Sequence, residues 1–231
     1  DGIDDAVLTA SAFLHVSAIS QAIGPVAADA VFAAMETVRA AGGGVAYDTN
    51  LRLKLWPLAR AQAIIGHSLA MVDIALPGMD DARLLTGLED PDAIIDWFLA
   101  RGVSMVALTL GAEGVVLATD GYRTRVAGHK VAAVDATAAG DTFDGVFLAA
   151  LAAGADPLSP ATTPASDAFR QRLILWDNFF CNDYCPRRLF LGPHEGRRGI
   201  AELMLNGTGM IETDLLLLDV MAAGEDRQAW L

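Results

Sequence analysis

The sequence predicts an α/β fold in which a Rossmann-like parallel sheet carries flanking helices. Short apolar runs alternate with stretches of helical periodicity, and Gly and Pro residues mark the boundaries between them. Hydrophobic residues make up 53% of the chain, which is enough for a sizeable core. Strands that alternate with helices form parallel sheets covered on both faces. Ligands bind such sheets beyond the carboxyl ends of the strands, so residues that follow strands are the candidate site residues.

The predicted elements follow one another along the first part of the chain. Apolar runs predict strands and helical periodicity predicts helices, while Asp120-Gly121 between two short strands predicts a hairpin late in the sheet. The predicted strands are residues 14–18, 45–48, 74–77, 106–110, 114–119 and 122–126, and the predicted helices are residues 27–40, 58–70 and 92–100.

A further helix is predicted after residue 140, with Gly154 placed to end it. Apolar side chains recur there at helical spacing, which predicts one buried helix face. That face would consist of Phe143, Val146, Phe147, Ala150 and Leu151.

Residues 134–145, VDATAAGDTFDG, are the most informative segment. They predict a strand end, a turn of small residues and a helix start. The small residues Ala138, Ala139 and Gly140 let an anion approach the backbone N–H groups, and the helix N-terminus adds a partial positive charge. Asp141 would be a base beside this anion site, as phosphoryl transfer to a hydroxyl requires. The alternative is an Asp that only caps the helix.

This segment resembles the signature of the ribokinase/PfkB family of carbohydrate kinases, with Ala138 in place of a Gly and Asp144 in place of an Asn. The resemblance implies a ribokinase-like fold and identifies Asp141 as the catalytic base. It also implies that the N–H groups of residues 138–141 form an anion hole, and that Asp135 lies near the cation sites.

Residues 47–56, YDTNLRLKLW, resemble a segment of the 2-keto-3-deoxygluconate kinases of this family. The resemblance implies that Asp48 and Asn50 line the active crevice. It implies that Arg52 contacts the transferring phosphate or a sugar-acid carboxylate, and a guanidinium suits either anion. The alternative for Arg52 and Lys54 is a solvated loop charge.

Residues 76–87 resemble the next motif of the family, in which an Asn-x-x-Glu quartet organises magnesium through water. Gly78 replaces the Asn and Asp81 replaces the Glu. The resemblance implies that Asp81 holds hydrated Mg²⁺, a cation that prefers carboxylate and water oxygens. The alternative is that Asp80 and Asp81 cap the helix that follows.

Thr109, Gly111 and Gly114 match the nucleotide loop of the family, where the backbone approaches ATP. An ordinary turn is the alternative for a Gly-x-x-Gly sequence. ATP and Mg²⁺ are therefore the cofactors that the resemblance implies.

The formal net charge of −13 argues against nucleic-acid and anionic membrane partners. We expect a small sugar or sugar acid and ATP as partners, and leave homo-oligomerisation open. The acidic start of the chain is not a signal peptide, so we expect a cytoplasmic location. Cys181 and Cys185 form a poor zinc site.

The domain organisation predicted is a partial kinase domain at 1–156, a Pro/Ser/Thr-rich linker at 157–168 and a foreign segment at 169–231. The last segment resembles the protein O-GlcNAcase/hyaluronidase-like β-N-acetylglucosaminidase family, which implies sugar contacts by Asn178, Asp183 and Asn206. The paired aspartates that perform the chemistry of that family have no counterpart in this chain, although carboxylates that act together must flank one bond.

We therefore expect ATP-dependent phosphorylation of a hydroxyl on a sugar or a sugar acid such as 2-keto-3-deoxygluconate. The kinase resemblance is truncated at both ends, which can leave the chain inactive. One alternative is a β-N-acetylglucosaminidase-type glycoside hydrolase, and a second is a non-catalytic nucleotide- or sugar-binding module. A deletion fusion of neighbouring genes and an assembly artefact would both give two incomplete enzymes joined in this way.

Overall fold

The computed structural model describes residues 5–128 and 138–152. These residues belong to two compact units, the first ending at Gly128 and the second beginning at His129. The domain boundaries predicted near residues 156 and 168 lie outside the described residues.

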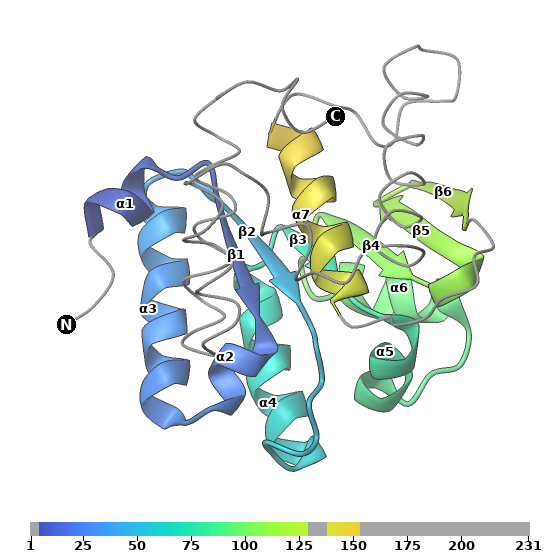
Figure 1. The fold of residues 1–231 in the computed structure, drawn as a ribbon, viewed down its shortest axis with the longest axis horizontal. Coiled ribbons are helices and arrows are strands. Elements are labelled where there is room, and N and C mark those ends of the chain that lie inside the picture. Colours follow the sequence, from blue (N-terminus) through green and yellow to red (C-terminus); the bar gives the residue numbers. More distant parts are fainter. Residues whose placement is uncertain (1–4, 129–137, 153–231) are drawn as a thin grey trace, which may run out of the picture. The chain divides into compact units, whose positions relative to one another are not determined.

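The first unit contains a six-stranded sheet whose strands lie side by side in chain order (Figure 1). β1 to β4 are parallel, whereas β5 runs antiparallel to β4 and β6 antiparallel to β5. The predicted hairpin of β5 and β6 is confirmed, but the antiparallel pairing of β5 with β4 departs from the predicted parallel sheet. The strands are β1 (Phe13–Ser17), β2 (Gly44–Asp48), β3 (Ile74–Leu76), β4 (Met105–Thr109), β5 (Gly114–Thr119) and β6 (Tyr122–Ala127).

The mixed sheet follows from the length of the connection between β4 and β5. Only a short 3₁₀ turn, η2 (Gly111–Glu113), lies in this connection. A parallel neighbour needs a crossover of about a dozen residues or more, whereas antiparallel strands can be joined by a tight turn. The chain must therefore reverse direction after β4.

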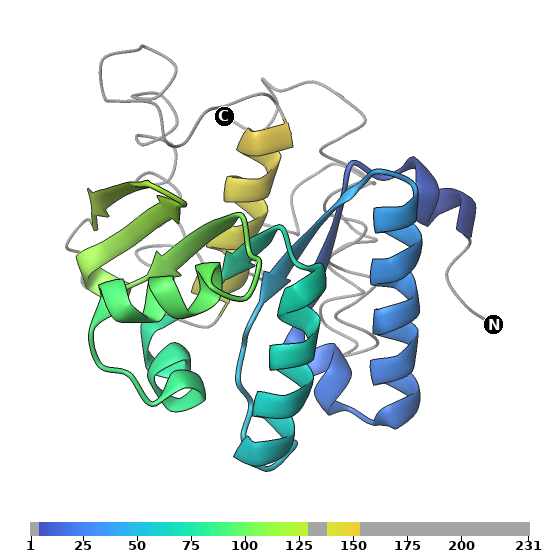
Figure 2. The same cartoon turned by 180° about the vertical axis from the view of Figure 1, so that it is seen from behind.

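Helices fill most of the longer connections of the first unit. Figure 2 shows α3, α4 and α6 on one face of the sheet. The three predicted helices are confirmed, α5 corresponds to the helix expected to follow Asp80 and Asp81, and α1 and α2 were not predicted. The helical elements are α1 (Asp5–Ala10), α2 (Ala18–Ala22), α3 (Pro25–Ala40), α4 (Leu58–Ser68), η1 (Leu69–Met71), α5 (Met79–Thr86) and α6 (Pro91–Leu99).

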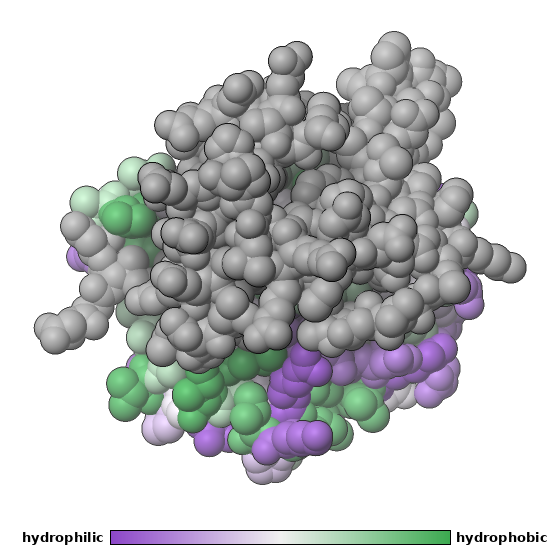
Figure 3. Space-filling model, in the orientation of Figure 1, coloured by the Kyte–Doolittle hydropathy of each residue, from purple (hydrophilic) through white to green (hydrophobic). Residues whose placement is uncertain are grey.

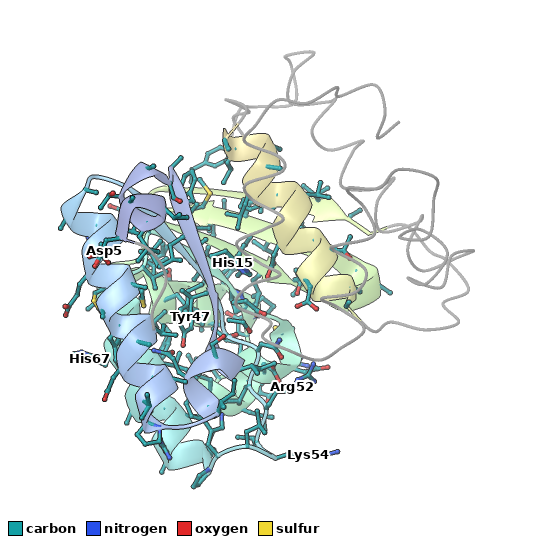
Figure 4. All side chains as sticks on the ribbon, turned by 60° about the vertical axis from the view of Figure 1, so that its left-hand side comes forward. Asp5, His15, Tyr47, Arg52, Lys54 and His67 are labelled. Atoms are coloured by element: carbon teal, nitrogen blue, oxygen red, sulfur yellow. The ribbon has the colours of Figure 1, made fainter. Side chains whose placement is uncertain are left out.

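A buried polar network connects β2 to two helices. The Tyr47 hydroxyl donates to Gln21 Oε1 at 2.5 Å, and Gln21 Nε2 donates to Ser68 Oγ at 3.0 Å. All three side chains are fully buried, and Figure 4 shows Tyr47 in the interior. Burial raises the pKa of the Tyr47 hydroxyl, so this group stays a neutral donor. The network therefore holds the carboxyl end of β2, which ends at Asp48, against α2 and α4.

Replacing Tyr47 by Phe should lower the free energy of unfolding by about 1–3 kcal/mol, because a buried acceptor on Gln21 loses its strongest donor. Tyr122→Phe is the matched control, since Tyr122 is 37% exposed on β6 and should change stability by less than about 0.5 kcal/mol. Urea unfolding of both variants checks this. Equal midpoints for the two variants would show that the network does not stabilise the first unit.

The described part of the second unit consists of Ala138 and α7 (Ala139–Ala152), and α7 confirms the predicted helix. Phe143 and Phe147 stack with their ring centroids 5.7 Å apart. The predicted buried face is only partly right, because the buried residues are Asp144, Phe147 and Leu148. Apolar periodicity could not place a carboxylate on that face. Gly154 lies outside the described residues.

Among residues 5–128 and 138–152, no helix is long and apolar enough to cross a membrane.

Candidate active site

The carboxyl ends of the parallel strands bring most of the predicted site residues of the first unit to one edge of the sheet. Asp48 ends β2 and is aligned with Ser17 on β1 and Leu76 on β3. Beyond β3, Gly78 forms an isolated parallel bridge with Thr109, which ends β4. The Thr109 N–H donates to the Pro77 carbonyl oxygen at 2.9 Å. Strand register therefore makes Asp48, Gly78 and Thr109 parts of the same edge.

The Asp48 carboxylate is held in a fixed orientation. Asp48 is only 9% exposed. Its Oδ1 accepts the Asn50 N–H at 3.0 Å, and its Oδ2 accepts the Ser17 hydroxyl at 3.4 Å. The bond to Asn50 turns the chain directly after β2, as Asp side chains often do. Ser17 was not predicted as a site residue, although its place at the end of a predicted strand was the available signal.

Arg52 and Lys54 lie on the loop of residues 49–57, which joins β2 to α4. Both are exposed, whereas Leu51 and Trp56, near the two ends of the loop, are buried. Figure 4 shows Lys54 extending away from the body of the protein, with Arg52 closer to the sheet edge. Two buried anchors thus present a short basic segment beside Asp48. This placement suits an anionic ligand.

Apolar side chains accompany these cations on the surface. Leu53 is 41% exposed and Leu55 is 50% exposed, both on the loop of residues 49–57. Where the face in Figure 3 is coloured, hydrophobic patches lie directly beside hydrophilic ones. The coloured part of this face is therefore mixed in character rather than uniformly charged.

Asp81 lies in the first turn of α5 but does not cap that helix. Its Oδ2 instead accepts the Leu51 N–H at 2.8 Å, across 30 residues of sequence. Burial raises the pKa of the Asp81 carboxyl, and the Leu51 N–H and the charge of Arg52 partly offset that rise. Asp81 is therefore directed toward the loop that carries Arg52.

Gly78 occupies the position at which the resembling motif has Asn. Neither the backbone conformation nor the surrounding atoms require a Gly there. Its φ of −83° and ψ of 143° suit any residue. An added Cβ would meet no heavy atom closer than the Thr109 hydroxyl at 3.7 Å. The position could therefore hold a side chain.

The predicted nucleotide loop is a tight structure between β4 and β5. Gly111 and Gly114 both have positive φ values, 57° and 98°. The Leu110 N–H donates to the Gly114 carbonyl oxygen at 2.7 Å. A Cβ on Gly111 would meet nothing within 4 Å, whereas one on Gly114 would lie 2.0 Å from the Val126 carbonyl oxygen. The space beside Gly111 is therefore open, while Gly114 is required by the fold.

The second unit supplies the predicted base at the start of α7. The first hydrogen bond of this helix runs from the Thr142 N–H to the Ala138 carbonyl oxygen at 3.0 Å. The N–H groups of residues 139–141 therefore precede the intrahelical ladder, as at any helix start. Asp141 is exposed in the first turn.

Ala138 adopts a left-handed conformation with φ of 62°. This conformation costs a residue with a Cβ about 1–2 kcal/mol, which explains why a Gly suits this position better.

The candidate residues thus form two sets. Asp48, Asn50, Arg52, Asp81, Thr109, Gly111 and Gly114 belong to the first unit, and Ala138, Ala139, Gly140 and Asp141 to the second. Asp135 and the predicted sugar contacts Asn178, Asp183 and Asn206 lie outside the described residues.

No group of three or more His, Cys, Asp or Glu side chains that could hold a metal occurs in the described part of the chain. Kinase sites bind Mg²⁺ through one or two carboxylates together with substrate phosphates and water. Asp48 and Asp81 are two carboxylates of the first unit near this edge of the sheet.

Comparison with known proteins identifies two matching segments. Residues 3–159 match the profile described as pfkB family carbohydrate kinase. Residues 159–210 match the profile described as beta-N-acetylglucosaminidase. Both resemblances inferred from the sequence are confirmed at the level of these profiles.

Individual relatives agree with the first match. A 2-dehydro-3-deoxygluconokinase of Bacillus subtilis (strain 168) is 35% identical over 135 residues, which cover 56% of this chain and 41% of that protein. The crystal structure of a PfkB protein from Polaromonas sp. JS666 has a TM-score of 0.63 and 31% identity, over 74% of this chain and 55% of that chain.

A fructokinase of Vibrio cholerae O395, crystallised in a fructose, ADP and calcium ion bound form, has a TM-score of 0.57 and 28% identity, over 72% of this chain and 52% of that chain. These structures confirm the predicted ribokinase-like fold. The chain spans about half the length of the relatives it matches.

Proposed function

Because the chain belongs to the pfkB family of carbohydrate kinases, we propose that it transfers the γ-phosphoryl group of ATP to a hydroxyl of a sugar or sugar acid. The observation that carries the proposal is the family match over residues 3–159, which includes the small-residue turn and Asp141 at the start of α7. Phosphoryl transfer demands chiefly positioning and neutralisation of charge. A base, an anion-binding helix start and a basic loop meet these demands.

In the proposed reaction Asp141 accepts the proton of the substrate hydroxyl. That hydroxyl oxygen forms a bond to the γ-phosphorus, and the bond from the γ-phosphorus to the bridging oxygen breaks, which releases ADP. The N–H groups at residues 138–141 stabilise the charge on the γ-phosphate oxygens, and losing one donor of this kind costs about 10²- to 10³-fold in rate. This role fits N–H groups that precede the first hydrogen bond of α7.

Nucleotide binding is assigned to Thr109, Gly111 and Gly114, and magnesium binding to Asp81 and Asp135. The open backbone at Gly111 supports the first assignment. The half-buried Asp81 carboxylate beside the sheet edge supports the second. Bound Mg²⁺ would neutralise phosphate charge. The ADP and metal ion in the name of the V. cholerae structure agree with this chemistry for that relative.

The substrate class we propose is a sugar acid of the 2-keto-3-deoxygluconate kind. Asp48 and Asn50 would bind hydroxyl groups, and Arg52 the carboxylate. The B. subtilis relative named 2-dehydro-3-deoxygluconokinase supports an acidic substrate, and the basic loop in an otherwise acidic chain supports it independently.

A panel of acceptors tests this function. The chain is incubated with ATP, Mg²⁺ and either 2-keto-3-deoxygluconate, fructose or ribose, and release of ADP is measured. We expect the fastest release with the sugar acid. Equal release with every acceptor, or with none added, would contradict sugar-acid phosphorylation.

Arg52→Ala should raise the KM for 2-keto-3-deoxygluconate about 10- to 100-fold, because a charge-assisted hydrogen bond to its carboxylate is lost. The KM for fructose, which has no carboxylate, should change little. Lys54→Ala is the matched control, since Lys54 lies on the same loop and extends away from the body of the protein. Equal increases for both sugars would remove the assignment of Arg52 to carboxylate recognition.

The match of residues 159–210 supports a second candidate function, hydrolysis of a β-N-acetylglucosaminide. Asn178, Asp183 and Asn206 would then contact the sugar. Release of a chromophore from an aryl N-acetylglucosaminide tests it directly. A third candidate is a non-catalytic nucleotide- or sugar-binding module, which calorimetric ATP binding without turnover would reveal. A cytoplasmic location remains part of the proposal for the kinase.

A further inference from the structure

The loop of residues 49–57 is packed through buried side chains such as Leu51 and Trp56, but it makes few hydrogen bonds to other described residues of the first unit. Within it, the Leu53 N–H donates to the Leu51 carbonyl oxygen and the Leu55 N–H to the Arg52 carbonyl oxygen. Both bonds are local. Among the described residues, the one hydrogen bond from residues 50–56 to a distant part of the chain joins the Leu51 N–H to Asp81 Oδ2, at 2.8 Å.

Asp81 is placed to hold this loop rather than its own helix. The N-terminus of α5 begins after Gly78 and has no side-chain cap. Asp80, one residue earlier, faces solvent and pairs with Arg83 at 3.4 Å. Asp81 instead turns back across the sheet edge to the residue that immediately precedes Arg52.

We propose that Asp81 is a positioning residue that holds the loop at Leu51 and thereby fixes the place of Arg52 at the sheet edge. Consecutive Cα atoms are about 3.8 Å apart, so an anchor on Leu51 restricts where the Arg52 side chain can start. The buried Leu51 side chain supplies the apolar half of the same anchor. The effect of the Arg52 position on substrate binding rests on the proposed function. The hydrogen bond between Asp81 and Leu51 does not depend on that function.

Hydrogen exchange of the unmodified protein tests whether the anchor exists. The Leu51 amide should exchange more slowly than the amides of Arg52 and Lys54, which donate to no acceptor among the described residues. Exchange of Leu51 as fast as that of these two neighbours would overturn the proposal without any variant.

Limited trypsin digestion tests the role of Asp81, because Arg52 and Lys54 are exposed cleavage sites within the loop. Asp81→Ala should speed cleavage at these two sites about tenfold, through loss of a charge-assisted hydrogen bond. Asp81→Asn retains a carbonyl oxygen that can accept the Leu51 N–H, and should restore most of the resistance. Asp80→Ala, next to it but solvent-facing, should cleave like the unmodified protein.

Cleavage after Arg101, outside the loop, distinguishes loop opening from general unfolding. We expect the Arg101 site to keep its rate in Asp81→Ala. Unchanged loop cleavage in Asp81→Ala, or cleavage of Asp81→Asn as fast as that of Asp81→Ala, would overturn the proposal. Should Asp81→Ala unfold as a whole, the exchange rate of Leu51 in Asp81→Asn decides, since the proposal requires it to stay slow.

These measurements use neither ATP nor sugar, so failure of the kinase proposal would leave them interpretable. If phosphorylation is observed, kinetics separate the two roles of Asp81. Loss of the anchor in Asp81→Ala should raise the KM for the sugar acid, and Asp81→Asn should rescue that KM. A purely metal-binding Asp81 would give the same defect in both variants, because both remove its charge.

Discussion

Asp141→Asn should lower the kcat for ATP-dependent sugar phosphorylation by about 10²- to 10⁴-fold while leaving ATP affinity within about threefold. The amide cannot take the hydroxyl proton, and general-base catalysis contributes a factor of this size. The backbone N–H groups at the start of α7 remain, so nucleotide phosphates can still bind there. ADP release gives kcat, and isothermal titration calorimetry gives the ATP affinity.

The control for this variant lies on the same helix. Asp144 is buried on α7, and the resembling signature carries Asn at its position, so Asp144→Asn makes the same chemical change three residues along the helix from the proposed base. It should keep kcat within about threefold, whereas losing a general base costs far more. Full activity in Asp141→Asn would end the assignment of Asp141 as the base.

Gly114→Ala should disrupt the β5–β6 hairpin and with it the predicted nucleotide loop. The new Cβ would lie 2.0 Å from the Val126 carbonyl oxygen, 2.4 Å from the Gly128 nitrogen and 2.7 Å from the Ala127 carbonyl carbon. All three are backbone atoms, so no side-chain rotation relieves the clash. Overpacking costs about 1–3 kcal/mol and the positive φ a further 1–3 kcal/mol. We expect a loss of about 2–6 kcal/mol in unfolding free energy.

Gly121→Ala separates the steric clash from the backbone strain. Gly121 lies in the turn between β5 and β6 with a positive φ of 82°, and an added Cβ would meet nothing within 4 Å. This variant should lose only the strain energy, about 1–2 kcal/mol. Urea midpoints of both variants, with calorimetric ATP binding, test the comparison. A Gly114→Ala protein as stable as Gly121→Ala would contradict the close packing at Gly114.

Most elements of the first unit could be predicted from the sequence because the parallel strands are short apolar runs, and Gly or Pro lies close to β2, β3 and β4. The strand ends at Asp48 and Thr109 were predicted within one residue of their observed positions. The five-residue α2 was too short to show helical periodicity. β5 was predicted with its observed bounds, but its antiparallel direction relative to β4 was not, because the short turn after β4, rather than any apolar pattern, determines that direction.

The candidate site was less predictable than the fold. Motif resemblance predicted Asp48, Asp81 and the residues around Gly114 individually, but not the hydrogen bonds that hold the Asp48 and Asp81 side chains in place. Asp81 and Leu51 are separated by 30 residues along the sequence. A pattern of neighbouring residues therefore could not predict their hydrogen bond. The buried Asp144 was missed for another reason, since burial of a carboxylate depends on its tertiary surroundings.

The most direct test of the central claim is a ³¹P NMR time course of the unmodified protein with ATP, Mg²⁺ and 2-keto-3-deoxygluconate. Phosphoryl transfer predicts a phosphomonoester signal that grows in step with ADP and fails to appear when the sugar acid is omitted. An unchanged ATP spectrum, or conversion of ATP to ADP and inorganic phosphate alone, would contradict the claim that this chain phosphorylates a sugar acid.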